Sequence, residues 1–198
     1  MSKINSILSK VNIVLVDTTH PGNIGATARA IKNMGIRNLK LVNPKEFPHE
    51  TAYFRAKAAK DILDSAIIFS NLEEAIKGSS IVVGTSARSR KVPWPLKTPR
   101  ESSQEIISLI NNSDSKVSII FGREDRGLTN EELSLCSHHV FIPTDPEYSS
   151  LNVSQAVQLM TYELRMTLLS HLEVNLSQEW DVPLAESQEI TNLINHFD

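Results

Sequence analysis

Apolar runs that alternate with helical segments limit this chain to few folds. Four apolar runs have the length and composition of buried strands, at residues 11–16, 39–42, 80–84 and 117–121. Shorter runs lie at 66–69 and 140–142. Strands joined through helices need crossover connections, which are right-handed and give parallel pairing. The pattern therefore predicts an α/β fold with a mostly parallel sheet flanked by helices.

Capping residues indicate where the expected helices begin and end. Three pairs have the spacing of a capping box: Asn71 with Glu74, Thr98 with Glu101, and Thr129 with Glu132. Pro99 suits a first helical position, while Gly35 and Gly78 predict helix ends. We also expect a helical segment over residues 50–63 and a long helix that opens near Val153.

The length of 198 residues suits one compact domain with a tail. We expect a domain over residues 1–171, then a linker and a terminal helix from about 184 to 196 that packs on another surface. No run approaches the roughly 18 apolar residues of a membrane span, so we expect a cytosolic protein. The single cysteine, Cys136, excludes an internal disulfide, and the six histidines fit no zinc-ligand spacing. No metal is expected.

Charge is distributed unevenly along the chain. The net charge is −3, yet residues 1–100 carry 16 Lys/Arg against 7 Asp/Glu, and residues 101–198 carry 4 against 16. Residues 88–100 hold five cations and no acid, which indicates a basic face for a polyanion such as RNA. The alternative is a cationic loop that only contacts solvent, and the charge pattern by itself favours neither interpretation.

The loops that follow the strands are the expected place for a site. In an open α/β sheet, ligands bind outside the carboxyl ends of the strands, here after residues 16, 84, 121 and 142. The sequence lacks the glycine patterns of dinucleotide- and NTP-binding loops, and no spacing supports a hydrolytic triad. In the turn before the long helix, Ser150 or Asn152 can cap the helix or contact a ligand; the pattern alone favours the cap.

Arg29 lies in a helix of small residues, Gly25-Ala26-Thr27-Ala28. Small side chains permit the close approach of another backbone or of a ligand. Taken by itself, Arg29 is more simply a surface arginine.

Three ordered motifs resemble those of the SPOUT superfamily. They are Asn23 to Arg29 (NIGATAR), Phe121 to Thr129 (FGREDRGLT), and Ile142-Pro143 with Ser149 to Ser154 (SSLNVS). The loop from Gly84 to Arg90 and Pro93-Trp94-Pro95 is similar to the TrmJ branch, the tRNA cytidine/uridine 2′-O-methyltransferases. The likeness covers about residues 10–170.

This resemblance implies a C-terminal trefoil knot and a bent S-adenosylmethionine held in it. Knots are almost absent from proteins, so no pattern argument predicts one. The cofactor-binding residues implied are Thr85, Ser86, Ala87, Gly122, Glu124, Ile142, Ser149, Ser150, Leu151 and Asn152. Several of them lie in the loops that follow strands, where a ligand is expected in an open α/β sheet.

The resemblance also implies the reaction, 2′-O-methylation of a tRNA ribose at cytidine or uridine 32 of the anticodon loop by a homodimer. The catalytic residues implied are Asn23, Arg29, Glu124, Ser150 and Asn152, and the RNA-binding residues are Arg29, Arg88, Arg90 and Lys91. Arginine is a poor base because its pKa exceeds about 12. We therefore expect Arg29 to hold an RNA phosphate and the developing alkoxide, with a substrate phosphate or Ser150 as proton acceptor, and Glu124 to order its loop. Alternatives are a non-catalytic RNA-binding module of the same fold and an enzyme acting on ribosomal RNA.

Members of the TrmJ branch continue beyond the position of Asp198 with a helical extension that supports dimerisation and tRNA binding. We expect residues 172–198 to be the start of such an extension, in a chain that is either truncated or naturally short. Donor binding should depend little on this segment, and full tRNA affinity should depend on it.

Overall fold

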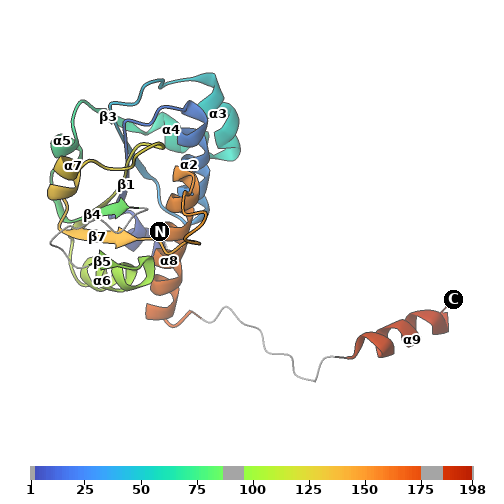
Figure 1. Ribbon diagram of the computed structural model, residues 1–198. Coiled ribbons are helices and arrows are strands. Elements are labelled where there is room, and N and C mark those ends of the chain that lie inside the picture. Colours follow the sequence, from blue (N-terminus) through green and yellow to red (C-terminus); the bar gives the residue numbers. More distant parts are fainter. Residues whose placement is uncertain (1–2, 87–95, 175–184, 198) are drawn as a thin grey trace.

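The computed structural model describes residues 3–86, 96–174 and 185–197, which form one layered α/β domain and a terminal helix (Figure 1). The strands of the described part are β1 Val11–Val16, β2 Asn38–Val42, β3 Ile67–Phe69, β4 Ser79–Ser86, β5 Leu96–Lys97, β6 Lys116–Phe121 and β7 His138–Phe141. The helices of this part are α1 Lys3–Leu8, α2 Pro21–Asn33, α3 Glu50–Ala56, η1 Lys57–Ala59, α4 Lys60–Asp64, α5 Leu72–Ile76, α6 Pro99–Asn112, α7 Asn130–Ser134, α8 Val153–His171 and α9 Ser187–Phe197.

The described strands form a single sheet in the order β3-β2-β1-β6-β4-β7-β5, and every neighbouring pair is parallel. β6 lies between β1 and β4, so Val11 pairs with Val117 and Gly84 pairs with Ile120. The predicted α/β class with a parallel sheet is confirmed. The trefoil knot stays a prediction.

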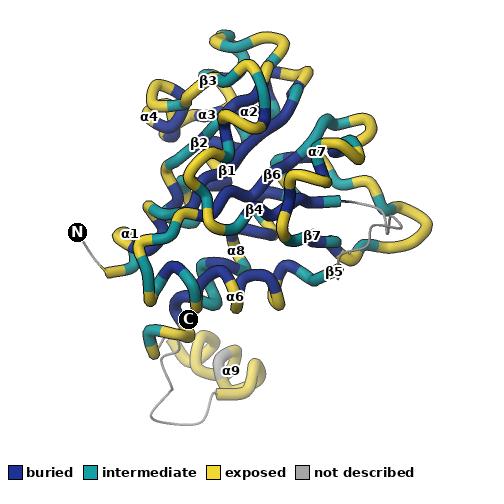
Figure 2. Tube along the Cα trace, turned by 90° about the vertical axis from the view of Figure 1, so that its left-hand side faces the viewer, coloured by how far each residue is buried: buried dark blue, intermediate teal, exposed yellow. Residues whose placement is uncertain are grey.

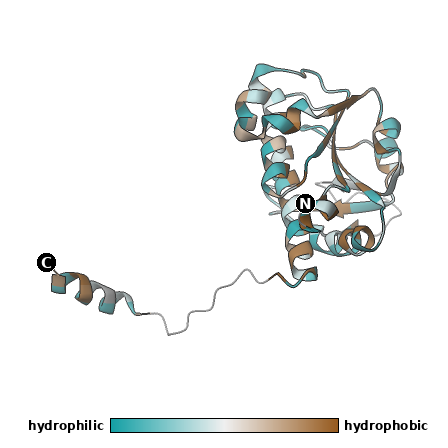
Figure 3. Cartoon of the chain, turned by 180° about the vertical axis from the view of Figure 1, so that it is seen from behind, coloured by the Kyte–Doolittle hydropathy of each residue, from teal (hydrophilic) through white to brown (hydrophobic). Residues whose placement is uncertain are grey.

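Helices cover both faces of the sheet, which explains why the strands read as continuous apolar runs. All six residues of β1 are buried (Figure 2). Ile13 and Leu15 pack with α2, α6 and α8, while Val14 and Val16 pack with α5 and α7 on the other face. Figure 3 shows the same arrangement as apolar strands between helices of mixed hydropathy.

The predicted helix boundaries are largely confirmed. Thr98 and Thr129 make complete capping boxes with Glu101 and Glu132. Asn71 makes only half of its box, because its side chain accepts from the Glu74 N–H and no return bond forms. Gly35 and Gly78 follow their helices with φ of 84° and 82°, a conformation that glycine adopts without strain.

Two local predictions are wrong, and a third is confirmed only in its bounds. The helical segment expected over residues 50–63 is helical from Glu50 to Asp64, but it is divided into α3, η1 and α4, with φ of 53° at Lys57. Strand β7 ends at Phe141, so Ile142 already belongs to the loop. The described side chains of α9 are exposed, among them Leu193, Ile194 and Phe197, so this helix does not pack on another surface of the single chain.

Among the described residues, no helix is both long and apolar enough to span a membrane.

Candidate active site

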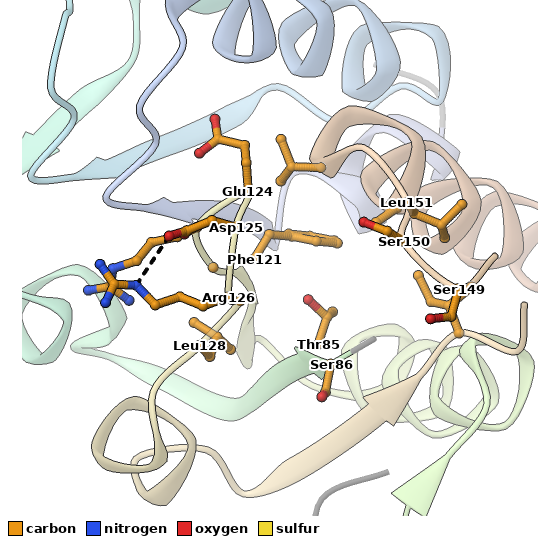
Figure 4. A pocket seen from close by; sticks show the side chains of 16 residues that line it. Thr85, Ser86, Phe121, Glu124, Asp125, Arg126, Leu128, Ser149, Ser150 and Leu151 are labelled. Atoms are coloured by element: carbon orange, nitrogen blue, oxygen red, sulfur yellow. Dashed lines mark ion pairs between the residues drawn. The ribbon is translucent and has the colours of Figure 1, made fainter. Parts of the chain in front are cut away.

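A pocket of about 260 Å³ opens at the carboxyl ends of β4, β6 and β7, and we call it the strand-end pocket. Thr85 and Ser86 form one wall, the 122–128 loop forms a second, and residues 149–151 form a third (Figure 4). The lining residues are Thr85, Ser86, Phe121, Gly122, Arg123, Glu124, Asp125, Arg126, Gly127, Leu128, Ile142, Ser149, Ser150, Leu151, Val153 and Ala156.

Most of the cofactor-binding residues implied by the resemblance line this pocket. Those that do are Thr85, Ser86, Gly122, Glu124, Ile142, Ser149, Ser150 and Leu151. Asn152 is not among the lining residues but caps α8 beside them. Ala87 lies outside the described residues. The structure thus brings together three parts of the chain, at residues 85–86, 121–128 and 142–156.

Two glycines shape the 122–128 loop. A methyl group on Gly122 would lie 2.2 Å from the carbonyl carbon of Gly127 and 2.3 Å from the Leu128 nitrogen, so no other residue fits there. Gly127 has φ of 71°, and its N–H donates to the Arg123 carbonyl at 2.9 Å. The loop therefore folds back on itself and presents main-chain groups to the pocket.

Arg123 anchors the same loop through two carboxylates, Asp17 and Glu132, which the sequence did not mark as site residues. Its Nη1 and Nη2 donate to the Glu132 carboxylate at 3.0 Å each, and Nη2 also pairs with Asp17. Only 14% of the Arg123 side chain is exposed, and the hydrogen bonds from Arg123 to Glu132 raise the arginine pKa above its ordinary value. No motif marks Asp17 because it lies 106 positions from Arg123.

Glu124 joins this loop to the turn that precedes α2. Its Oε2 accepts from the Thr19 N–H at 3.1 Å and the Thr19 hydroxyl at 3.0 Å, and its Oε1 accepts from Asn23 Nδ2 at 2.9 Å. Burial favours the neutral acid, but the hydrogen bonds from Asn23 and Thr19 outweigh it, so the pKa of Glu124 lies below its ordinary value. An ionised carboxylate with several donors suits an ordering role.

Asn152 extends this chain of hydrogen bonds across the site. Its Nδ2 donates to Asn23 Oδ1 at 3.0 Å, while its Oδ1 accepts from the Ser154 N–H at 2.9 Å and caps α8. The choice left open between Ser150 and Asn152 is thus resolved in favour of Asn152 as the cap. Ser150 is exposed, and its hydroxyl has no hydrogen-bond partner among the described residues.

Thr85 lines the pocket and also joins two strands of the sheet. Its hydroxyl is buried and donates to the Ile120 carbonyl at 2.8 Å, which ties β4 to β6. A ligand in the pocket would therefore meet the Thr85 main chain and methyl group.

Arg29 lies away from this pocket in its own chain. It is exposed on α2, six residues or about 9 Å along the helix axis from Asn23, and is not among the lining residues. It has no hydrogen-bond or ion-pair partner within the described part of the chain. The small residues of this helix serve a neighbouring backbone: a methyl group on Gly25 would lie 2.1 Å from the Ala52 carbonyl oxygen of α3.

The predicted RNA-binding residues Arg88, Arg90 and Lys91 lie outside the described residues. Within residues 3–86, 96–174 and 185–197, no group of three or more His, Cys, Asp or Glu side chains could hold a metal ion.

Comparison with known proteins places these features in a family. The model of the SpoU rRNA Methylase family matches residues 10–162. The tRNA (cytidine/uridine/adenosine-2′-O-)-methyltransferase TrmJ of Pseudomonas aeruginosa is 52% identical over 164 residues, 83% of this chain and 63% of that protein. The tRNA (cytidine/uridine-2′-O-)-methyltransferase TrmJ of Yersinia pestis is 43% identical over 194 residues, 97% of this chain and 75% of that protein. The chain thus spans less than two thirds of the first relative.

Solved structures of similar fold include other methylases. A probable methylase family protein from Haemophilus influenzae superposes with a TM-score of 0.79 at 38% identity, covering 96% of this chain and 78% of that one. The SpoU methyltransferase AviRb from Streptomyces viridochromogenes, in complex with the cofactor AdoMet, has a TM-score of 0.62 at 20% identity over 80% of this chain and 60% of that one, a likeness of fold alone.

Proposed function

This chain belongs to the SpoU rRNA methylase family, and from that premise we propose that it methylates the 2′-hydroxyl of a tRNA ribose, with S-adenosylmethionine as donor. The observation that carries the proposal is the strand-end pocket, which the second and third motifs line. Asn23 of the first motif is tied to this pocket by one chain of hydrogen bonds that joins Glu124, Asn23 and Asn152. We further propose cytidine or uridine 32 of the anticodon loop as the target.

The lining of the strand-end pocket suits the donor. Gly122 leaves room where any side chain would collide with its own loop, and the Thr85 main chain offers neutral groups to a purine edge. Ile142 and Leu151 add apolar surface. The bound donor would supply an electrophilic methyl group, and everything else required by the reaction falls to residues of this chain.

Two polar side chains, Ser150 in the pocket and Arg29 outside it on α2, have no hydrogen-bond or ion-pair partner in the described part, and we assign them to the substrate. Arg29 can hold an RNA phosphate and stabilise the charge that develops on the 2′-oxygen. Ser150 has an exposed hydroxyl that can accept the proton or pass it to a substrate phosphate. Asn23, Glu124 and Asn152 bond mainly to one another and to the backbone, which suits residues that position the site.

We propose that the working form is a homodimer. Arg29 lies outside the pocket of its own chain, so a second copy offers the means to bring it to a methyl-transfer centre. Leu159 and Tyr162, one turn apart on α8, are 43% and 47% exposed, and α8 packs beside α2, the helix of Arg29. Exposed apolar side chains on a helix that packs against α2 suit a protein contact.

Incubation of the chain with S-adenosylmethionine and unmodified tRNA tests the proposal. We expect mass spectrometry of the digested RNA to find 2′-O-methylcytidine or 2′-O-methyluridine, and sequencing of tRNA from a deletion strain to show one lost methyl group. Methylation of ribosomal RNA alone would reassign the substrate. RNA binding without methylation of any RNA would favour the non-catalytic alternative.

A further inference from the structure

An exposed aromatic ring among unpaired cations lies on α3, η1 and the start of α4, on a surface to which neither the motifs nor the pocket extends. We call it the α3 face and define it by Phe54, Arg55, Lys57 and Lys60. Phe54 is 67% exposed, which is unusual for a phenyl ring in a domain that buries its core completely. Figure 2 shows this part of the molecule as mostly exposed.

The cations of the α3 face are not used by the fold. Arg55, Lys57 and Lys60 are exposed and form no ion pair within the described part of the chain. Of the acids nearby, Asp61 pairs with Lys32 at 2.6 Å and Arg37 at 3.2 Å, and Asp64 lies close enough to Tyr53 to raise the Tyr53 pKa. Glu50, in the first turn of α3, is exposed and forms no ion pair within the described part of the chain. Residues 29–64 carry eight Lys/Arg and four Asp/Glu, so the α3 face lies in a cationic region.

Lys57 and Phe54 are arranged as a pair. The Lys57 ammonium lies 3.9 Å from the centroid of the Phe54 ring, within cation–π range. The backbone at Lys57 adopts φ of 53°, a strained conformation for a residue other than glycine, and α3 ends there. Because 67% of Phe54 is exposed, its ring can also stack on a planar group.

A continuous path of packed residues joins the α3 face to the candidate active site. Packing of α3 on α2 is close enough that a methyl group on Gly22 would lie 3.7 Å from Arg55 Cγ. Gly22 precedes Asn23, whose side chain bonds to Glu124 in the wall of the strand-end pocket. A polyanion bound at the pocket could therefore extend over the first turn of α2 onto Arg55 and then Phe54.

We propose that the α3 face binds an unpaired segment of the RNA substrate, with one base stacked on Phe54 and the flanking phosphates on Arg55, Lys57 and Lys60. The proposal rests on the proposed function, because it names where that substrate extends beyond the target nucleotide. Aromatic stacking combined with cations that track the backbone is how proteins hold single-stranded nucleic acid. A protein partner would favour a wider apolar surface, whereas the α3 face offers one ring among three cations.

Substitution of Phe54 separates stacking from simple apolar contact. We expect Phe54→Leu to weaken binding of an unmodified tRNA transcript about five- to a hundredfold, since loss of one base–aromatic stack has that effect. We expect Phe54→Trp to bind as well as the wild type or better, because indole also stacks. Equal affinity of Phe54→Leu and wild type would overturn the proposal.

Removal of the cations should change the salt dependence. We expect the double variant Arg55→Ala with Lys57→Ala to reduce the slope of log K against log salt by about 0.7 for each single-strand phosphate that the protein no longer neutralises. The matched control is Lys77→Ala with Lys116→Ala, which removes the same charge after α5 and at the amino end of β6. An equal change in the control would show that net charge alone decides, and would overturn the proposal.

Two further measurements separate this proposal from its premise. Failure of the wild-type chain to methylate any RNA would refute the proposed function, whereas methylation by the wild type with unaltered tRNA affinity in every α3-face variant would refute the α3 face alone. Sedimentation of the Phe54→Leu variant completes the test. A changed oligomeric state would make the surface a protein contact and overturn the assignment to RNA.

Discussion

Replacement of Glu124 by glutamine tests whether this carboxylate holds the 122–128 loop against the turn before α2. Three of its hydrogen bonds, from Thr19 N–H, Thr19 Oγ1 and Asn23 Nδ2, are 3.1 Å or shorter. Glutamine has nearly the same shape, but its amide nitrogen must face either Asn23 or Thr19, and both present donors. At least one charge-assisted hydrogen bond is therefore lost.

The loss of stability that we expect for Glu124→Gln follows from this one hydrogen bond. A hydrogen bond to a charged group contributes about 1.5–3 kcal/mol, and the low end applies because Glu124 is only half-buried. We expect Glu124→Gln to lower the free energy of unfolding by about 1.5 kcal/mol at pH 7, a fall in Tm of about 3–6 °C for a chain of this size. Thermal unfolding followed by circular dichroism measures it.

The effect of pH has a definite sign. The pKa of folded Glu124 lies below its ordinary value of 4.5, since hydrogen bonds to the carboxylate outweigh its burial. A lowered folded pKa means that the charged group stabilises the fold above the unfolded pKa, and that this stabilisation disappears as pH falls through the folded pKa. The difference in Tm between wild type and Glu124→Gln should therefore be constant from pH 8 to 6 and shrink below about pH 4.5.

Asp125→Asn is the matched control. Asp125 is the next residue, 69% of its side chain is exposed, and its ion pair with Arg126 is 3.6 Å long. Exposed pairs of this kind contribute little, so we expect a change within about 0.5 kcal/mol. The reasoning fails if Glu124→Gln melts within a degree of Asp125→Asn at pH 7, or if its difference from wild type is undiminished at pH 3.5.

Four more outcomes follow from the same structure. Arg29→Lys should lose methyl transfer nearly as badly as Arg29→Ala, on the order of a hundred- to a thousandfold in single-turnover assays, with donor binding intact, because lysine lacks the planar fork; near-normal transfer by the lysine variant would contradict this. Alanine at the three cations of residues 88–91 should weaken RNA binding and flatten its salt dependence without changing donor affinity by calorimetry. Gly25→Ala should cost about 2 kcal/mol or more in urea unfolding, because its methyl group would meet the Ala52 carbonyl oxygen at 2.1 Å. Burial, with a smaller effect of a nearby carboxylate, raises the pKa of Cys136 to about 12, so its thiol should react with Ellman's reagent at pH 8 only after unfolding.

Local patterns in the sequence determined the elements of this protein. A strand buried on both faces needs only a run of apolar residues, as in β1, and a capping box needs only two residues three positions apart, as at Thr98 and Thr129. These patterns involve residues that are close together in the sequence. The strands, most helix boundaries and the parallel α/β class could therefore be predicted. The motif residues came from a family resemblance, and most of them do line one pocket.

Only the tertiary structure decided how those elements meet. The insertion of β6 between β1 and β4, the pairing of Arg123 with Asp17, and the contact of Asn23 with Asn152 join residues about 36 to 130 positions apart, and no local pattern specifies such partners. The break at Lys57 is a further case. The buried residues around it keep the spacing of a continuous helix, so no local pattern predicts φ of 53° at this lysine.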